Sequence, residues 1–236
     1  MGEMIGKQSV KFAEAPYIFE GASVVGPKEG EGPLGKLFDV IEQDPMLGSK
    51  SWEEAESLLQ KETVQKLLLK SGLKKEDIRY IFAGDLLGQL IATTFGIMDY
   101  EIPFMGLYGA CSTMGEGLSL AAMMVAAGYG ENVIAMASSH FGSAERQFRF
   151  PLEYGNQRPF SATWTVTGCG AAIVTKRKGF ARITGVTTGK IIDYGVKDAQ
   201  NMGACMAPAA ADVIYNHLND FGTAPDDYDK IITGDL

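Results

Sequence analysis

Between residues 51 and 71, apolar side chains recur at the spacing of an α-helix. Ser51 followed by Glu54 is the pattern of a capping box, in which a hydroxyl and a carboxylate each bond a free amide at the start of a helix. Gly72 stands where a left-handed residue would end the helix. The pattern predicts a helix over residues 51–71, with the apolar positions Trp52, Ala55, Leu58, Leu59, Val64, Leu67 and Leu68.

Short apolar runs alternate with helical segments in the middle of the chain. Strands are expected at residues 80–83, 103–107 and 132–138, and helices at 86–98 and 112–127. Alternation of this kind is typical of a mostly parallel sheet with helices on both faces. The sequence therefore predicts an α/β fold.

The remaining segments have different patterns. Residues 26–33, rich in Gly and Pro, are expected to be a surface loop. Residues 164–174 and 180–188 are expected to be antiparallel strands that are joined by a turn at 176–179. Residues 207–218 are expected to form a further helix.

The chain matches itself when it is shifted by 150 residues. In each copy a helix is followed by a glycine, an acidic turn, an apolar strand and Gly-Asp-Leu. These matches predict a duplicated α/β half whose second copy begins near residues 205–236 and is cut off at its first strand. Residues 1–236 would then be one domain with a complete first half, a fragment that lacks on the order of 100 residues. The alternative is two unrelated helix–strand units with common turn residues. The identical pairs are Leu68/Leu218, Gly72/Gly222, Asp77/Asp227, Ile81/Ile231, Gly84/Gly234, Asp85/Asp235 and Leu86/Leu236.

Charge and composition exclude several classes of function. The 21 basic and 29 acidic residues give a net charge of −8, which is the wrong sign for a protein that neutralises nucleic-acid phosphates. The longest apolar run, residues 118–127, is too short to span a membrane, and the N-terminus lacks the basic and apolar regions of a signal peptide. We therefore expect no nucleic-acid partner and synthesis in the cytoplasm.

The three cysteines, Cys111, Cys169 and Cys205, are 58 and 36 residues apart, so no close pair suggests a metal site. Cys111 follows a predicted strand and opens a helix rich in small residues, which is expected to be buried almost all round. The amides and the dipole at such a helix start favour a thiolate and can stabilise an oxyanion. Cys111 is therefore a candidate nucleophile, or else a small apolar residue at a crowded helix start. Cys169 and Cys205 are expected to be packing residues.

His140 follows the predicted strand at 132–138, at the carboxyl end where parallel sheets bind ligands. A nucleophilic thiol is usually paired with a histidine base, so His140 is a candidate partner of Cys111. Arg146 and Arg149 follow among aromatic residues, and a guanidinium group can hold a carboxylate through two hydrogen bonds. A small dicarboxylate is one candidate ligand; the alternative is a long loop whose arginines pair with nearby glutamates.

Several stretches together resemble one family. A cysteine that opens a small-residue helix in the first half of a duplicated α/β chain is similar to the layout of the thiolase superfamily. A closer resemblance, which covers almost the whole chain, is to the stage V sporulation protein AD family of spore-forming bacteria. The stretches that carry it are residues 25–29 (VGPKE), 31–35 (EGPLG), 109–113 (GACST), 138–140 (SSH), 144–149 (AERQFR), 206–212 (MAPAAAD) and 225–229 (PDDYD).

This resemblance implies a thiolase-like layered αβαβα fold and a part in the SpoVA system. That system moves dipicolinic acid, as its calcium chelate, into the developing spore and releases it at germination. The resemblance further implies binding without catalysis, no cofactor other than calcium carried by the chelate, a homodimer, and action with SpoVA membrane proteins at the spore inner membrane. Dipicolinic acid is compatible with the amides of Cys111 and Ser112, with Arg146 and Arg149, and with His140.

Two other functions remain open from the sequence. Cys111 matches the nucleophile position of the superfamily, so the second hypothesis is an acyltransferase that resembles a type-III ketoacyl-ACP synthase. In catalytic relatives the partner histidine and its helper lie in the second half, which this sequence does not contain, so acyl transfer by this chain alone is not expected. A third hypothesis is a scaffold that acts only through its surfaces.

Overall fold

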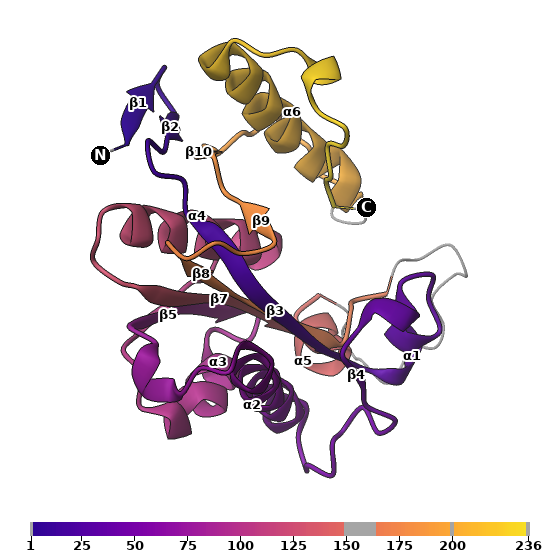
Figure 1. The fold of residues 1–236 in the computed structure, drawn as a ribbon. Coiled ribbons are helices and arrows are strands. Elements are labelled where there is room, and N and C mark those ends of the chain that lie inside the picture. Colours follow the sequence, from indigo (N-terminus) through magenta and orange to yellow (C-terminus); the bar gives the residue numbers. More distant parts are fainter. Residues whose placement is uncertain (1, 149–163, 199–200, 235–236) are drawn as a thin grey trace. The chain divides into compact units, whose positions relative to one another are not determined.

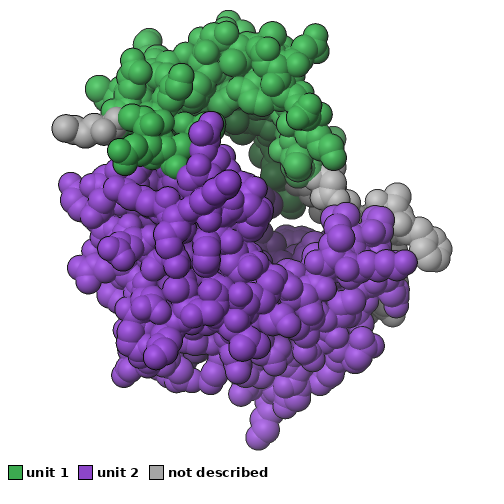
Figure 2. All heavy atoms as spheres, in the orientation of Figure 1, with its two compact units in different colours: residues 1–15, 183–236 green, residues 16–182 purple. Residues whose placement is uncertain are grey.

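The computed structural model describes residues 2–148, 164–198 and 201–234 of the chain. The chain forms two compact units, one of residues 16–182 and one of residues 1–15 and 183–236 (Figure 2). Each unit contains a β-sheet of its own.

The larger unit is built on a mixed sheet. Its strands are β3 (Tyr17–Val25), β4 (Val40–Ile41), β5 (Tyr80–Asp85), β6 (Phe104–Gly106), β7 (Asn132–Ser139), β8 (Gly168–Thr175) and β9 (Ala181–Arg182). The strand order is β4-β3-β8-β7-β5-β6, with β9 beside β3 (Figure 1). Strands β3 to β7 run in one direction, and β8 is antiparallel to both of its neighbours, β3 and β7. The predicted α/β class is confirmed.

Helices cover both faces of this sheet. They are α1 (Pro27–Gly30), α2 (Trp52–Ser71), α3 (Ile91–Ile97), α4 (Thr113–Ala126) and α5 (Phe141–Glu145). α2 and α3 lie against one face and α4 against the other (Figure 1). α2 begins and ends as predicted: the Ser51 side chain accepts a hydrogen bond from the amide of Glu54, and Gly72 is left-handed.

Side-chain alternation along β7 separates the two faces. Ile134 and Met136 belong to the apolar core that α2 covers, whereas Ala135 lies under Gly117 of α4. The expectation that α4 is buried almost all round is wrong, because its small residues pack against the sheet on one side only. Gly115 and Glu116 are exposed, and the buried residues are Thr113, Gly117, Ala121, Ala122 and Val125.

The predicted hairpin after residue 164 is also wrong. The first of its two strands begins later, at Gly168, and pairs with β3 and β7. The chain then crosses to the other edge of β3, where β9 pairs with Tyr17 and Ile18. That edge is available because β4 pairs only with Val24 and Val25. Sequence patterns do not reveal such a partner exchange, because it depends on contacts between distant segments.

The smaller unit has a three-stranded antiparallel sheet and one long helix. The strands are β1 (Glu3–Ile5), β2 (Ser9–Lys11) and β10 (Gly185–Thr187), in the order β1-β2-β10, and the helix is α6 (Met202–Phe221). The Ser9 hydroxyl donates to Asp220 of α6 at 2.7 Å and joins the helix to the sheet. α6 starts earlier than predicted because Asn201 caps it, accepting a hydrogen bond from the amide of Ala204 at 3.0 Å.

The segments 150 residues apart have the same local geometry. α6 covers the same positions as α2 when the residue numbers of α2 are raised by 150. Both helices end at a left-handed glycine, with φ of 69° at Gly72 and 64° at Gly222. In the turn that follows, Asp77 and Asp227 each accept a backbone amide at 2.8 Å, three residues upstream. β5 comes next in the first segment, and no strand is present in the described residues 229–234 of the second. This geometry is what the duplication predicts locally, and duplication of the whole half stays a prediction.

Candidate functional site

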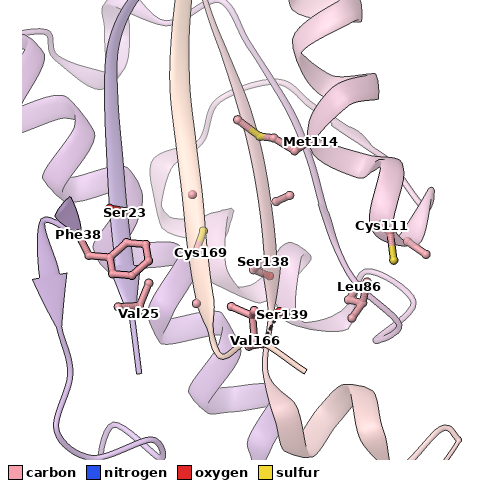
Figure 3. A pocket seen from close by; sticks show the side chains of 14 residues that line it. Ser23, Val25, Phe38, Leu86, Cys111, Met114, Ser138, Ser139, Val166 and Cys169 are labelled. Atoms are coloured by element: carbon pink, nitrogen blue, oxygen red, sulfur yellow. Dashed lines mark hydrogen bonds between the residues drawn. The ribbon is translucent and has the colours of Figure 1, made fainter. Parts of the chain in front are cut away.

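A pocket of about 310 Å³ opens where the carboxyl ends of β3 and β7 meet the start of β8 (Figure 3). The start of α4 and the residue after β5 complete its wall. No charged side chain is present among the described residues that line it. These residues are Ser23, Val25, Phe38, Leu86, Ala110, Cys111, Met114, Ala137, Ser138, Ser139, Val166, Gly168, Cys169 and Gly170.

Glycines at the start of β8 leave room for this pocket. Gly168 and Gly170 pair with Ser139 and Ala137 of β7, so four small residues lie side by side in the sheet. A Cβ atom on Gly170 would meet no other atom within 4 Å. A side chain at residue 170 would therefore extend into the open space of the pocket.

Cys111 lines this pocket at the start of α4. It lies in a short 3-10 turn, Ala110–Ser112, directly before the helix, and its thiol is exposed. Figure 3 shows Cys111, Met114 and Leu86 on one side of the view, with Val25 and Phe38 on the other. The amide of Thr113, the first residue of α4, donates to the carbonyl of Ala110 in this turn, so what the start of α4 offers an anion is mainly the positive end of the helix dipole.

The turn that carries Cys111 has a constrained backbone. Ala110 has a φ of 48°, in the left-handed region that is unfavourable for a residue with a Cβ atom. The Ser112 hydroxyl donates to the carbonyl of Gly109 at 2.7 Å, which closes the turn. The Ser112 amide, predicted to contact the ligand, donates to the same carbonyl at 3.0 Å, and the residue is exposed.

His140 is buried and lies outside the set of residues that line the pocket. It caps α5: Nδ1 accepts a hydrogen bond from the amide of Gly142 at 3.1 Å. Because Nδ1 is an acceptor, Nε2 carries the proton and donates to the carbonyl of Pro45 at 2.7 Å. Burial lowers the pKa of His140, although the Pro45 carbonyl opposes this. The imidazole of His140 is thus neutral, and both of its nitrogens are hydrogen-bonded to the backbone. It does not line the pocket that contains Cys111.

Arg146 also lies outside the pocket lining. It forms an ion pair with Glu53 of α2, and its guanidinium group lies 5.9 Å from the centre of the Trp52 ring. Arg146 therefore behaves as in the alternative in which the arginines pair with glutamates, although its partner belongs to α2. Arg149 lies outside the described residues, so the predicted pair of arginines is not tested.

The other two cysteines differ from each other. Cys169 is 2% exposed, forms part of the apolar core and also lines the pocket. Burial raises the pKa of its thiol to about 12, so the thiol is neutral and packs as expected. Cys205 is exposed on α6, so the expectation that it packs is wrong.

A buried polar network, which the sequence analysis did not predict, lies behind the pocket. Its centre is Glu56 of α2, which accepts hydrogen bonds from the Ser138 hydroxyl at 2.7 Å and the Ser143 hydroxyl at 2.6 Å. Gln60 donates to Ser138 at 2.6 Å and to Thr93 at 3.1 Å. One sequence signal could have found it: Glu56, Gln60 and Thr63 recur at helical spacing on the buried face of α2.

The network ends at the loop that follows β5. Thr93 of α3 donates through its hydroxyl to Asp85 at 3.0 Å. The other oxygen of the Asp85 carboxylate accepts the amide of Leu90 at 3.2 Å. Asp85 is fully buried and directly precedes the pocket residue Leu86. The network therefore joins α2, α3, β5, β7 and α5 behind the pocket wall.

Two kinds of feature are absent from the part of the chain that the structure describes. No three His, Cys, Asp or Glu side chains come together there in an arrangement that could hold a metal ion. In the same residues, none of the helices has the length and apolarity needed to cross a membrane.

Solved structures with a similar fold are thiolase-like enzymes. Germicidin synthase from Streptomyces coelicolor, a type III polyketide synthase, matches with a TM-score of 0.60 at 13% identity, covering 91% of this chain and 77% of that one. The 3-oxoacyl-[acyl-carrier-protein] synthase III from Aquifex aeolicus matches with a TM-score of 0.55 at 13% identity, covering 89% and 73%. At these identities the likeness concerns the fold alone, and it confirms the expected thiolase-like fold.

Sequence comparison identifies the family. Residues 6–236 match the model of the stage V sporulation protein AD family. The chain is 43% identical over 234 residues to stage V sporulation protein AD of Bacillus subtilis (strain 168), and the match covers 99% of this chain and 69% of that protein. Both matches extend over the elements that build the pocket. The chain therefore belongs to the stage V sporulation protein AD family.

Proposed function

We propose that this protein binds dipicolinic acid, with calcium as its chelate, in the pocket beside Cys111, and that this binding serves uptake into the developing spore. The observation that carries the proposal is the position of Cys111 and the start of α4 in the wall of a pocket in which Gly170 leaves open space. Family membership supplies the link to sporulation. The identity of the ligand comes from the resemblance.

The form of the pocket suits a flat ring with carboxylates. Phe38 and Val25 provide apolar contacts, and Gly170 leaves open space in the pocket because it has no side chain. The positive end of the α4 dipole favours a carboxylate on this side of the pocket. A planar aromatic ring can stack on Phe38 while one carboxylate is directed towards the start of α4.

The charge of the pocket favours the calcium chelate over the free dianion. Burying a charge without a compensating partner is costly, and none of the described lining residues carries one. One calcium ion neutralises the two carboxylates of dipicolinate, so a one-to-one chelate enters without net charge. Calcium is then cargo that arrives with its ligand, and the protein need not provide a metal site.

Two features of the site support binding without acyl transfer. Cys111 has no histidine beside it among the described lining residues, and His140 uses both of its ring nitrogens elsewhere. A thiol without a positioned base is a weak nucleophile at neutral pH. We therefore assign Cys111 a binding role in the wall of the pocket.

Calorimetry with calcium dipicolinate tests the proposal, using the wild-type protein and a Gly170→Val variant. We expect binding by the wild type and at least a tenfold loss of affinity in the variant, because the new side chain occupies the pocket. A Gly234→Val variant makes the same change outside the pocket lining, at a residue where an added Cβ atom would meet no other atom within 4 Å; it is the control and is expected to bind normally. Equal affinity of wild type and Gly170→Val would place the ligand elsewhere.

A further inference from the structure

Glu56 is a buried carboxylate that lies one hydroxyl group behind the pocket. The residue is 1% exposed. Its Oε1 accepts the hydroxyl of Ser138 at 2.7 Å, and Ser138 is one of the residues that line the pocket (Figure 3). Its Oε2 accepts the hydroxyl of Ser143, on the side away from the pocket. Within the described residues, Glu56 forms no ion pair with a lysine, arginine or histidine.

In the described helices and strands around Glu56, no cation compensates its charge. Asp85 of β5 and Cys169 of β8 are the titratable groups that act on it or are acted on by it electrostatically. On α5, His140 is buried with a lowered pKa, and Glu145 is a buried acid.

Two cations near the ends of α2 are engaged elsewhere. Arg146, which follows α5, pairs with Glu53. Glu20 of β3 pairs with Lys70 at the opposite end of α2. Among the residues that the structure describes, an ionised Glu56 is therefore stabilised by hydroxyl dipoles alone.

This environment makes Glu56 titrate near neutral pH. Burial raises its pKa to about 7, against the hydrogen bonds from Ser143 and Ser138, which lower it. The neutral and the ionised forms of the side chain are thus both populated under ordinary conditions. Each form presents a different potential at the pocket wall.

We infer that Glu56 determines which charge state of the ligand the pocket accepts: ionised Glu56 disfavours a free dicarboxylate dianion, and it leaves an uncharged one-to-one calcium chelate unaffected. The inference rests on the proposed function of the pocket. Ser138 transmits the effect, since its hydroxyl connects the wall to the carboxylate. Gln60 keeps that hydroxyl oriented, because it donates to the same Ser138 oxygen.

The two ligand forms should respond differently to pH. A dianion repels the ionised carboxylate through a medium of low effective dielectric, so dianion binding takes up a proton at Glu56. Its affinity should fall by on the order of tenfold as the pH rises from 6 to 8.5. The carboxylates of the ligand titrate far below this range, as carboxylates do. The affinity of the neutral chelate should stay constant.

Calorimetry over this pH range tests the inference directly. Dipicolinate is titrated in the presence of a calcium chelator, and calcium dipicolinate is titrated separately, with wild type, Glu56→Gln and Glu62→Gln. We expect Glu56→Gln to bind the dianion equally well from pH 6 to 8.5, since glutamine has a similar shape without the charge. Glu62→Gln makes the same change in net charge on the same helix, away from the pocket lining, and should keep the wild-type profile.

The outcomes separate this inference from the proposed function. If the wild type binds both ligands with the same pH dependence, or if Glu56→Gln keeps the wild-type profile, the inference is overturned and the proposed function stands. If neither ligand binds the folded wild type at any pH, the proposed function fails and the inference fails with it. Should Glu56→Gln not fold, wild-type calorimetry in two buffers of different ionisation enthalpy still decides, because only the dianion should take up a proton.

Discussion

Nε2 of His140 lies 2.7 Å from the carbonyl oxygen of Pro45, a residue 95 positions earlier in the chain. This hydrogen bond and the cap at Gly142 hold the imidazole inside the larger unit, where it joins the start of α5 to the segment before α2. The histidine that follows β7 therefore stabilises the fold behind the pocket. It is not placed to remove a proton from Cys111.

Replacing His140 should reduce stability more than ligand binding. His140→Ala leaves the Pro45 carbonyl and the Gly142 amide without partners, so we expect a loss of about 2–4 kcal/mol in the free energy of unfolding. His140→Asn restores an acceptor at the helix cap and should recover part of this loss. Denaturant unfolding measures both, and a loss of binding by His140→Asn at unchanged stability would contradict this role.

Stability should also fall in mild acid because of His140. Its folded-state pKa is lowered below the ordinary value of 6.5, so the unfolded chain takes up a proton that the folded chain excludes. The stabilising contribution is therefore complete above pH 6.5 and is lost as the pH falls below it. Unfolding measured from pH 7.5 to 5 should show a smaller change for His140→Asn than for wild type once the carboxylate titration common to both is subtracted.

Glu56 should have the opposite effect on stability. Its pKa is raised in the folded state from 4.5 to about 7, so the folded chain holds a proton that the unfolded chain has released. Its favourable contribution is complete below pH 4.5 and is lost as the pH rises through 7. Relative to wild type, Glu56→Gln should gain about 3 kcal/mol between pH 4.5 and 8. A constant difference between the two proteins over that range would show that Glu56 does not titrate there.

The three cysteines should differ in reactivity. Iodoacetamide should modify the exposed Cys111 and Cys205 in the folded protein, while Cys169 is spared because its thiol is buried with a raised pKa. Calcium dipicolinate should protect Cys111 and leave Cys205 unaffected. Mass spectrometry of the digested protein reports both sites in one experiment, with Cys205 as the internal control.

In the same assay acyl-CoA should leave no adduct on Cys111, and a stoichiometric adduct would favour the acyltransferase hypothesis.

The homodimer that the family resemblance implies should form along β6. This strand lies at the end of the sheet order, and unpaired edge strands readily add a further strand. Three apolar side chains near this edge are exposed: Met105 of β6 (38%), Phe95 of α3 (61%) and Met98, which directly follows α3 (59%). Met105→Asp should shift the protein to monomers in light scattering, whereas Leu37→Asp, at another exposed position, should not. A dimer unaffected by Met105→Asp would exclude β6 as the interface.

The features that local sequence determines were predicted well. α2 was predicted within one residue because its cap at Ser51, its stop at Gly72 and its apolar spacing all lie inside the segment. The pocket position of Cys111 was also predictable, since a strand followed by a helix start is a local pattern.

The features that depend on distant partners were not predictable. β8 lies between β3 and β7 and pairs with both, and no local pattern records which strands it joins. His140 was placed correctly at the end of β7, but its partner Pro45 is remote in sequence. Glu56 was missed because charged residues in a helix are usually exposed, and only the structure shows Ser138 and Ser143 beside it.

A crystal structure of the protein with calcium dipicolinate would show where the chelate binds, because the anomalous signal of calcium locates it. We expect a planar ligand between Cys111 and Gly170, with a carboxylate at the start of α4. A ligand bound at any other place, or a pocket that stays empty at saturating chelate, would contradict this expectation.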